Sequence, residues 1–207
     1  WTEWGGRKDT PVSSGWTVVA INSQMLNTLV TYLEMNSKPN RANLRVPDLK
    51  ISLKHIEKPT ISFYRYLYDS IGEDWLWYER RVMSDSDLVN IIQNKDVEVY
   101  VLSVEDSPAG LGELDRRLSS DIKLAHFGLL PEFIGRGLGH YFLGWLIEQA
   151  WSYIPQRVWL HTCDLDHPNA LPLYQKAGFI PYKRETETFK NPCAAGLFPN
   201  WVDPRPG

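Results

Sequence analysis

The sequence of 207 residues has only two cysteines, Cys163 and Cys193, and it has no long apolar run. A disulfide framework is therefore not expected, and we expect reduced thiols and a cytoplasmic location. No apolar segment reaches about 18 residues and no charged-then-apolar leader opens the chain, so we expect no membrane partner. The chain begins at Trp1 rather than at a methionine, which leaves open whether the natural chain begins earlier.

The chain also lacks an excess of positive charge. It has 22 lysines and arginines against 25 aspartates and glutamates, a formal net charge of −3, and no basic run. Because a nucleic-acid site needs a basic surface for phosphates, this balance argues against a nucleic-acid partner. With 43% apolar residues, the chain can bury one sizeable core. We expect one domain over residues 1–189 and a proline-rich tail over 190–207 that packs as an extended arm or stays mobile.

The most informative segment is a glycine-punctuated turn between a β-rich run and an amphipathic one. The run over 122–130 is followed by Gly135, Gly137 and Gly139, and apolar residues recur at helical spacing from Leu138 onward. Glycines let the backbone approach a ligand, and the first turn of a helix supplies free N–H donors and the positive end of a dipole. We therefore expect a pyrophosphate cradle, although a tight turn into a packed helix has the same pattern.

Two common phosphate motifs do not fit this turn. No Gly-Lys-Ser or Gly-Lys-Thr follows it, which excludes a P-loop. A Rossmann fingerprint needs a third glycine where this chain has His140, and no long parallel βαβ pattern follows.

A second motif lies downstream of the glycine turn. A β-rich run over 157–163 precedes a short helical pattern that ends at Gly178. Together the two motifs resemble the signature of the GCN5-related N-acetyltransferase (GNAT) superfamily, Gln/Arg-x-x-Gly-x-Gly/Ala followed by Asn-x-x-Ala-x-x-Leu-Tyr-x-x-x-Gly-Phe. The resemblance covers about residues 97–184. The matching positions are Gly137, Gly139, Ala170, Leu173, Tyr174, Gly178 and Phe179.

The chain departs from the family pattern at two positions. Ile134 stands where glutamine or arginine is usual, in a role that is mostly backbone. His167 stands at the asparagine position, with Asn169 two residues later, and either side chain can cap the short helix or touch the cofactor.

The resemblance implies an α/β (α+β) fold with a mixed, mostly antiparallel central sheet and helices on both faces. In the family the sheet splays between the fourth and fifth strands, and acetyl-CoA enters this notch as the acyl donor, without a metal. By resemblance, Phe127 and Leu129 offer backbone groups to the pantetheine arm, and we expect a bulge at 127–129 to free them. The residues expected to hold the rest of the cofactor are Ile134, Gly135, Arg136, Gly137, Leu138, Gly139 and Asn169.

The remaining patterns assign further elements by residue range. Residues 16–21 and 97–104 have strand patterns, and 111–117 is expected to form a hairpin with the latter through a turn at 106–110. We expect a last strand over 180–188. The helical patterns cover 23–36, capped by Ser23; 63–82, aromatic-rich and broken at Gly72; and 84–94, capped at Ser84. Residues 41–58 resemble irregular or strand structure.

The chemistry that the resemblance implies is direct attack of an amine on a thioester, which needs a base, oxyanion donors and an acid for the thiolate. Tyr174 matches the family tyrosine whose hydroxyl lies by the departing sulfur, and the ordinary pKa of tyrosine, about 10, keeps it protonated. The alternative role is a core tyrosine that anchors the short helix.

The sequence does not identify the base. The positions that relatives use hold Lys123 and Thr162 here, and neither is a convincing base. A water relay to Glu113 or Asp115 is the further option; an exposed ion pair with Arg116 or Arg117 is the alternative role of these two residues. Strand alternation places His126 and His161 away from the expected substrate face, so we expect structural roles for both.

Substrate specificity in this superfamily lies largely before the third strand. Trp75 and Tyr78 stand there among other aromatic and acidic residues. Aromatic walls with carboxylates suit a cationic amine that carries an apolar body, although aromatics at helical spacing also fill cores. The neighbouring residues are Tyr64, Tyr66, Tyr68 and Trp77, with Asp69, Glu73 and Asp74 interleaved.

Three classes of function follow from these observations. The first is an acetyl-CoA-dependent N-acetyltransferase acting on a primary amine of a small molecule or amino acid. The second is a peptide or protein N-acetyltransferase, and the third is a non-catalytic acyl-CoA-binding module. We expect a monomer or a homodimer with a small-molecule amine as its partner.

Overall fold

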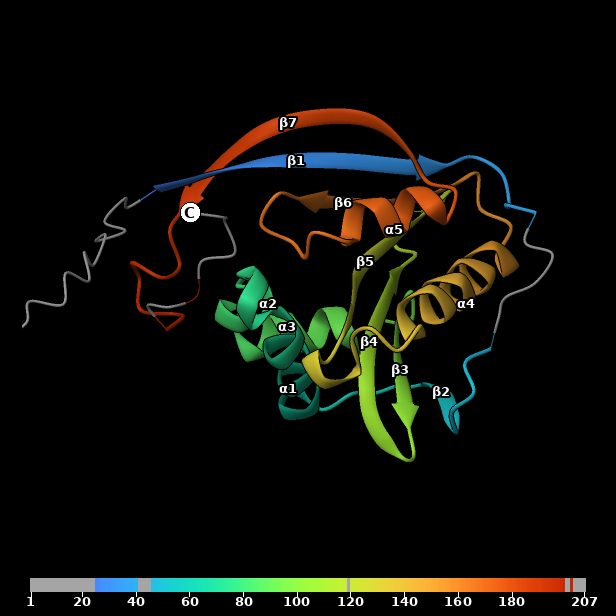
Figure 1. The fold of residues 1–207 in the computed structure, drawn as a ribbon. Helices are drawn as coiled ribbons and strands as arrows, with labels where there is room; N and C mark the ends of the chain where they lie inside the picture. Colours follow the sequence, from blue (N-terminus) through green and yellow to red (C-terminus); the bar gives the residue numbers. More distant parts are fainter. Residues whose placement is uncertain (1–24, 41–45, 119, 200–201, 203–207) are drawn as a thin grey trace, which may run out of the picture.

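The computed structural model describes residues 25–40, 46–118, 120–199 and 202. At its centre is a seven-stranded sheet with the order β2-β3-β4-β5-β6-β1-β7 (Figure 1). Neighbouring strands are antiparallel except for the parallel pair β5 and β6. The strands are β1 Met25–Met35, β2 Ile51–His55, β3 Val97–Val104, β4 Ser107–Asp115, β5 Asp121–Leu129, β6 Arg157–Cys163 and β7 Ile180–Lys190.

Helices cover both faces of this sheet, which confirms the predicted α/β architecture. Helices α4 and α5 enclose a core on one face, and α1 and α3 enclose a second core on the other. The bounds are α1 Ile61–Gly72, η1 Glu73–Trp75, α2 Glu79–Val82, α3 Asp85–Ile92, η2 Pro131–Phe133, α4 Leu138–Ser152 and α5 Ala170–Lys176.

Strand β1 corrects one prediction, because residues 23–36 were expected to be helical. In the described part, Leu26, Thr28 and Val30 are buried and the residues between them are exposed, which is the period-2 pattern of a strand. The strand pairs on one edge with β6 and on the other with β7. These tertiary pairings override the weak helical preference of the segment. The predicted cap Ser23 and the predicted strand over 16–21 lie outside the described residues.

The other helices begin and end close to the predicted positions. Thr60 caps α1, its hydroxyl accepting a hydrogen bond from the Phe63 N–H at 3.3 Å, and α1 ends at Gly72 as expected. Ser84 caps α3 in the same way through the Asp87 N–H at 3.2 Å. The turn between β3 and β4 is tighter than predicted, because β4 already begins at Ser107.

The described part of the C-terminal tail packs against the domain. Phe198 and Val202 are buried in a small cluster with Leu26 and Leu76. The Arg81 guanidinium lies 4.3 Å from the centre of the Phe198 ring. Of the two alternatives expected for the tail, packed or mobile, the described residues are packed.

Strands β5 and β6 pair over a short distance only. Their register runs from Asp121 opposite Arg157 to Lys123 opposite Trp159, and no further pairs join them in the described sheet. The strands therefore part after Lys123, as the family resemblance implied, and the edge of β5 beyond this point is not covered by β6.

A β-bulge lies at Ala125, not at 127–129 as expected. Glu113 pairs with His126 but Leu114 pairs with Leu124, so Ala125 is an extra residue in β5, while pairing at 127–129 is regular. The extra residue reverses the alternation of side chains. Leu124 faces the α4 side before the bulge, whereas after it Phe127 faces this side and His126 faces α1.

The buried carboxylate of Glu113 joins the helical layer to the sheet. The Arg80 Nη2 donates to it at 2.8 Å, the Tyr64 hydroxyl donates at 2.5 Å, and the His126 Nδ1 lies 3.4 Å away. The predicted exposed pair with Arg116 or Arg117 is therefore wrong for Glu113. Burial alone would raise the pKa of Glu113, but His126, Arg80 and Tyr64 together lower it to about 2.

We predict that Glu113→Gln destabilises the protein in a pH-dependent way. The folded pKa of about 2 lies below the ordinary 4.5, so the carboxylate stabilises the fold above pH 4.5 and this contribution is lost as the pH falls toward 2. The free energy of unfolding at pH 7 should fall by about 3–5 kcal/mol, and the difference from the parent protein should shrink toward pH 2. Urea denaturation across this range measures it.

The matched control is Asp115→Asn. Asp115 forms an ion pair with Arg117, whose side chain is 43% exposed, so its loss should cost about 1 kcal/mol or less. A difference for Glu113→Gln that stays constant from pH 7 to pH 2 would contradict the prediction.

Candidate active site

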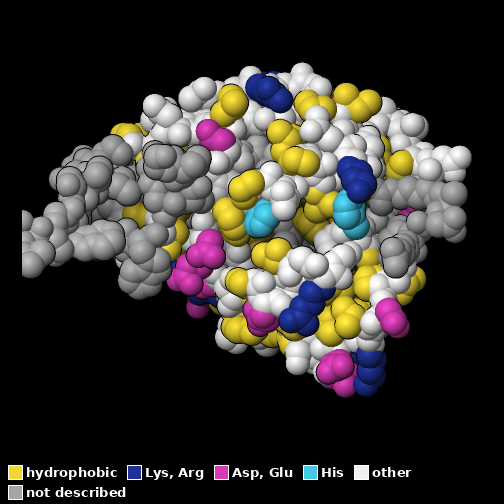
Figure 2. Space-filling model, viewed as in Figure 1, with side chains coloured by type: hydrophobic (Ala, Val, Ile, Leu, Met, Phe, Trp, Pro, Cys, Tyr) yellow, Lys and Arg dark blue, Asp and Glu magenta, His cyan; other side chains and the backbone are white. Residues whose placement is uncertain are grey.

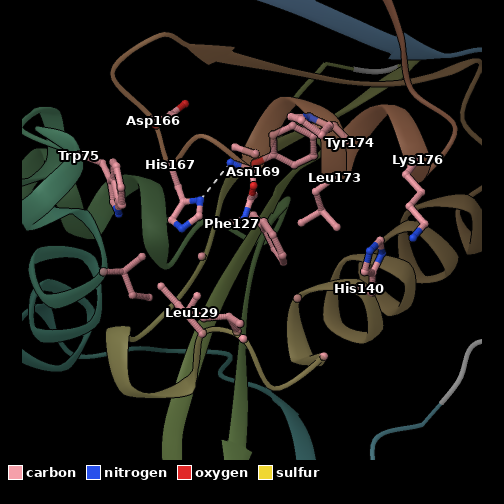
Figure 3. Close-up of a pocket in the computed structure, with 18 of the residues that line it drawn as sticks. Trp75, Phe127, Leu129, His140, Asp166, His167, Asn169, Leu173, Tyr174 and Lys176 are labelled. Carbon is pink, nitrogen blue, oxygen red and sulfur yellow. Dashed lines mark hydrogen bonds between the residues drawn. The ribbon is translucent and has the colours of Figure 1, made fainter. Parts of the chain in front are cut away.

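A cavity of about 430 Å³ opens where β5 and β6 part, between the start of α4 and helix α5 (Figure 3). We call it the glycine-loop cavity. Around its mouth the surface has apolar and histidine side chains, with a basic side chain beside one histidine, and acidic side chains gather toward α1 and α2 (Figure 2). Its lining includes Phe127, Leu129, Ile134, Gly135, Gly137, Gly139, His140, Asn169, Leu173, Tyr174 and Lys176.

The loop before α4 has the backbone that the glycine pattern predicts. Gly135 and Gly137 have φ values of 82° and 78°, in the left-handed region that favours glycine. No heavy atom lies within 4 Å of a Cβ placed at either residue, so this side of the loop is open. The 15-residue helix α4 then begins at Leu138 with its free N–H groups next to the cavity.

The side chains of this loop have different surroundings. Leu138 is fully buried in the core, so it offers only backbone groups to a ligand. The Arg136 guanidinium lies 5.3 Å from the centre of the Phe133 ring and is not part of the cavity wall. Lys176 on α5 and His140 on α4 face one another across the cavity mouth (Figure 3).

The free edge of β5 faces the gap. The Leu130 N–H donates to the Ala109 carbonyl at 2.9 Å, toward β4. Because backbone groups alternate between the two edges of a strand, those of Phe127 and Leu129 point toward the edge that β6 has left. An extended molecule in the cavity can therefore pair with them as a further strand would.

Tyr174 closes the inner end of the cavity. Its ring packs against Phe127 and Phe179, with centroid distances of 6.2 and 6.3 Å. Burial and then the charge of Asp166 raise the pKa of Tyr174 well above its ordinary value, so it stays a proton donor. No hydrogen bond joins its hydroxyl to another described residue, which leaves this group available to a ligand.

The two candidate cap residues at the start of α5, His167 and Asn169, have different roles. The Asn169 N–H donates to the His167 Nδ1 at 3.0 Å, shown as the dashed line in Figure 3. The Asn169 side chain makes no capping hydrogen bond with the helix, and it lines the cavity. The His167 ring lies 4.9 Å from the Trp75 ring.

A second cavity of about 180 Å³ lies on the other side of Phe127 and Tyr174. We call it the histidine cavity. It shares Trp75, Trp77, Phe127, Asp166 and Tyr174 with the glycine-loop cavity, so one wall separates two spaces. Its other lining residues include Tyr68, Tyr78, Glu79, His126, His161, Cys163, Glu187 and Phe189.

The two tryptophans are placed by a strained turn. Leu76 between them is buried and has a φ of 55°, which is unusual for a residue other than glycine. The Trp77 Nε1 donates to Asp166 at 3.2 Å, and the Thr162 hydroxyl donates to the same carboxylate at 2.7 Å. Thr162 therefore fixes Asp166 and lines neither cavity.

Charge in the histidine cavity is negative. Among the described lining residues, Glu79, Asp166 and Glu187 are acidic and none is a lysine or arginine. Burial, followed by the charge of Lys123, lowers the pKa of His161, which keeps this ring neutral near pH 7. Such a cavity suits a small molecule with a positive charge.

The structure brings most of the predicted site residues together. Trp75, Tyr78 and Tyr174 line the histidine cavity, while Arg136, Leu138, Glu113 and Thr162 are not part of either cavity wall. The predicted carboxylates do not line it, since Asp69 pairs with Arg81 at 3.2 Å. Trp77, from the aromatic segment expected to form a substrate wall, also lines both cavities, whereas Glu79, His126, His161, Lys176 and Glu187 were not expected as lining residues.

Two further properties concern the chain as far as it is described. No group of three or more histidine, cysteine, aspartate or glutamate side chains could hold a metal ion. None of the described helices is long and apolar enough to cross a membrane.

Several solved structures share this fold. A functionally unknown conserved protein from Staphylococcus epidermidis has a TM-score of 0.58 at 15% identity, over 80% of this chain and 62% of that one. A GCN5-related N-acetyltransferase from Kribbella flavida has a TM-score of 0.54 at 14% identity, over 82% of this chain and 60% of that one. The ribosomal-protein-S18-alanine N-acetyltransferase from Escherichia coli has a TM-score of 0.52 at 15% identity, over 64% of this chain and 79% of that one. The chain thus covers about 60% of the length of the first two proteins.

The family comparison covers the site itself. No curated protein matches the sequence. The model of the acetyltransferase (GNAT) family matches residues 61–179, which contain both glycine-loop and α5 motifs and most of the lining of the two cavities. The chain therefore belongs to the acetyltransferase (GNAT) family.

Proposed function

We propose that the protein is an N-acetyltransferase that moves the acetyl group of acetyl-CoA to a primary amine of a small molecule. The observation that carries this proposal is the shared wall of the two cavities. A donor in the glycine-loop cavity and an acceptor in the histidine cavity would meet beside Phe127 and Tyr174.

The glycine-loop cavity fits coenzyme A in three places. The amides of residues 135–139 and the start of α4 suit its diphosphate, and Lys176 adds a positive charge at the mouth. The free edge of β5 at Phe127 and Leu129 suits the pantetheine amides. The thioester then lies at the inner end of the cavity, next to the Tyr174 hydroxyl.

The histidine cavity supports a small cationic acceptor. Tyr78 packs on Phe189 with ring centroids 5.5 Å apart and nearly parallel rings, which gives an apolar wall. Glu79 and Glu187 supply negative charge at the same cavity. With a volume of about 180 Å³, it suits a small amine or amino acid better than a folded protein chain.

We also propose a cellular location and an oligomeric state for the enzyme. Neither Cys163 nor Cys193 forms a disulfide bond, which supports a cytoplasmic location. A monomer or homodimer remains our prediction for its oligomeric state.

A mass-spectrometric screen tests the proposal. Acetyl-CoA is incubated with the protein and a panel of small amines, amino acids and peptides with free N-termini, and thiol release is followed in parallel. Acetylation of small cationic amines supports it. Acetylation of peptides alone would assign the protein acetyltransferase alternative, and tight acetyl-CoA binding without turnover would assign a non-catalytic binding module.

We predict that Tyr174→Phe lowers kcat on any accepted amine by about a hundred- to ten-thousandfold, the range of one acid or base. The change removes only the hydroxyl, so the ring contacts with Phe127 and Phe179 should remain. Stopped assays with saturating acetyl-CoA measure kcat, and thermal unfolding checks the fold. An unchanged kcat would exclude Tyr174 as the acid.

We also predict a crossed pair of binding defects. Tyr78→Ala, in the histidine cavity only, should raise KM for the amine about tenfold without changing the Kd for acetyl-CoA. Lys176→Met, in the glycine-loop cavity only, should weaken acetyl-CoA binding several-fold, more at low salt, with little change in amine KM. Calorimetry and initial rates measure both. Trp75 is less suited to this test because it lines both cavities. Equal losses of both substrates in either variant would contradict the assignment of the cavities.

A further inference from the structure

We propose that His126 is the base that removes the proton from the acceptor ammonium, and that Glu113 is the positioning residue that holds its ring. This inference rests on the proposed acetyl transfer. Without the bulge at Ala125, strand alternation would place the His126 side chain on the opposite face of the sheet.

His126 lies at the wall where donor and acceptor would meet. It lines the histidine cavity together with Phe127 and Tyr174, and its side chain is 14% exposed. The ring packs against Tyr68 and Trp77, with centroid distances of 5.1 and 5.5 Å. Its Nδ1 is buried and lies 3.4 Å from the Glu113 carboxylate, at ion-pair distance but without a hydrogen bond, so Nε2 is the nitrogen left for a molecule in the cavity.

Glu113 has the properties of a fixed counter-charge. Its side chain is completely buried and lines neither cavity, so it does not touch substrate. Arg80 and Tyr64 hold its two oxygens from α2 and α1, and these bonds keep it ionised. A buried carboxylate next to Nδ1 orients the ring and attracts the positive charge that the ring gains during the reaction.

The other charged groups around His126 come from several elements. Arg80 on α2 partly neutralises the negative charge of Glu113. Lys123 on β5 and His161 on β6 lie on the same side of the sheet as His126. Glu79 on α2 and Asp166 after β6 line the cavity and favour an ammonium ion beside the ring.

His161 is the competing residue, but its surroundings differ. It lines the same cavity, and burial lowers its pKa and so its strength as a base. No described carboxylate lies within ion-pair distance of its ring, which instead lies 5.8 Å from the Tyr32 ring. Of the two histidines, only His126 has a buried acid behind it.

The proton balance of the step is complete with these groups. The neutral His126 ring takes one proton from the ammonium, and the free amine forms a C–N bond with the thioester carbonyl carbon. The C–S bond breaks, the thiolate takes the Tyr174 proton, and Tyr174 recovers a proton from the new amide nitrogen. The products are an amide, a thiol and a protonated His126, which returns its proton to solvent.

The first test compares His126→Gln with His55→Gln on the small amine that gives the highest turnover. His55 lies on β2, away from both cavities, so its variant should keep the parent rate. His126→Gln should lower kcat by about 10²–10⁴-fold without changing the Kd for acetyl-CoA, and the fall of kcat/KM on the acid side should lose its His-type inflection. Added imidazole should restore part of the rate.

The second test uses Glu113→Gln and a readout that needs no substrate. The neutral His126 ring should carry its proton on Nδ1, beside the carboxylate, in the parent protein, and the ring 15N chemical shifts should show a loss of this tautomer preference in the variant. The kcat should fall about tenfold without a change in the Kd for acetyl-CoA. If this variant does not fold, the same spectra and rates of Glu113→Asp, which keeps the charge but draws it back from the ring, make the same test.

The outcomes separate this inference from the proposed function. Absence of acetyl transfer to every amine in the parent protein would overturn the proposed function. Transfer in the parent protein with an unchanged pH profile in His126→Gln, or loss of the inflection in His161→Gln instead, would overturn the inference alone. An unchanged His126 tautomer and an unchanged kcat in a folded Glu113 variant would overturn the role of Glu113.

Discussion

Strands β5 and β6 are joined through only three residue pairs, and both cavities exist because they part after Lys123. A fully paired sheet would cover the β5 edge at Phe127 and Leu129 and close the space between the α4 loop and α5. A parallel pair normally continues along the strand, since each unpaired backbone group costs stability unless another partner satisfies it. The open edge is thus left to water or to a ligand, and an acyl donor with its own amides is the partner that we propose.

The extra residue at Ala125 determines which side chains of β5 line each cavity. Without this bulge, His126 would face the α4 core and Phe127 would face α1. With it, Phe127 closes the glycine-loop cavity, while His126 reaches the histidine cavity and pairs across the strands with Glu113. One inserted residue therefore places an apolar wall and a titratable ring on the two sides of a single strand, which is what a two-substrate reaction requires.

The parts of the site that are local in sequence could be predicted, and the rest could not. The left-handed glycines 135 and 137 and the helix that carries Tyr174 follow from short motifs. Strand β1 was expected as a helix because its pairing with β6 and β7 depends on residues more than 120 positions away. His126 was placed on the wrong face because a bulge leaves no clear mark in a sequence. Glu187 reaches the site from β7 only through the same long-range pairing.

In the proposed enzyme, the thioester lies at the wall formed by Phe127 and Tyr174, with the diphosphate on the loop of residues 135–139. A crystal structure of the protein with acetyl-CoA would show this arrangement. We expect the diphosphate oxygens within hydrogen-bond distance of the loop amides, the pantetheine paired with β5, and the sulfur next to the Tyr174 hydroxyl. Acetyl-CoA bound elsewhere, or bound with its sulfur far from Tyr174, would overturn the proposed arrangement.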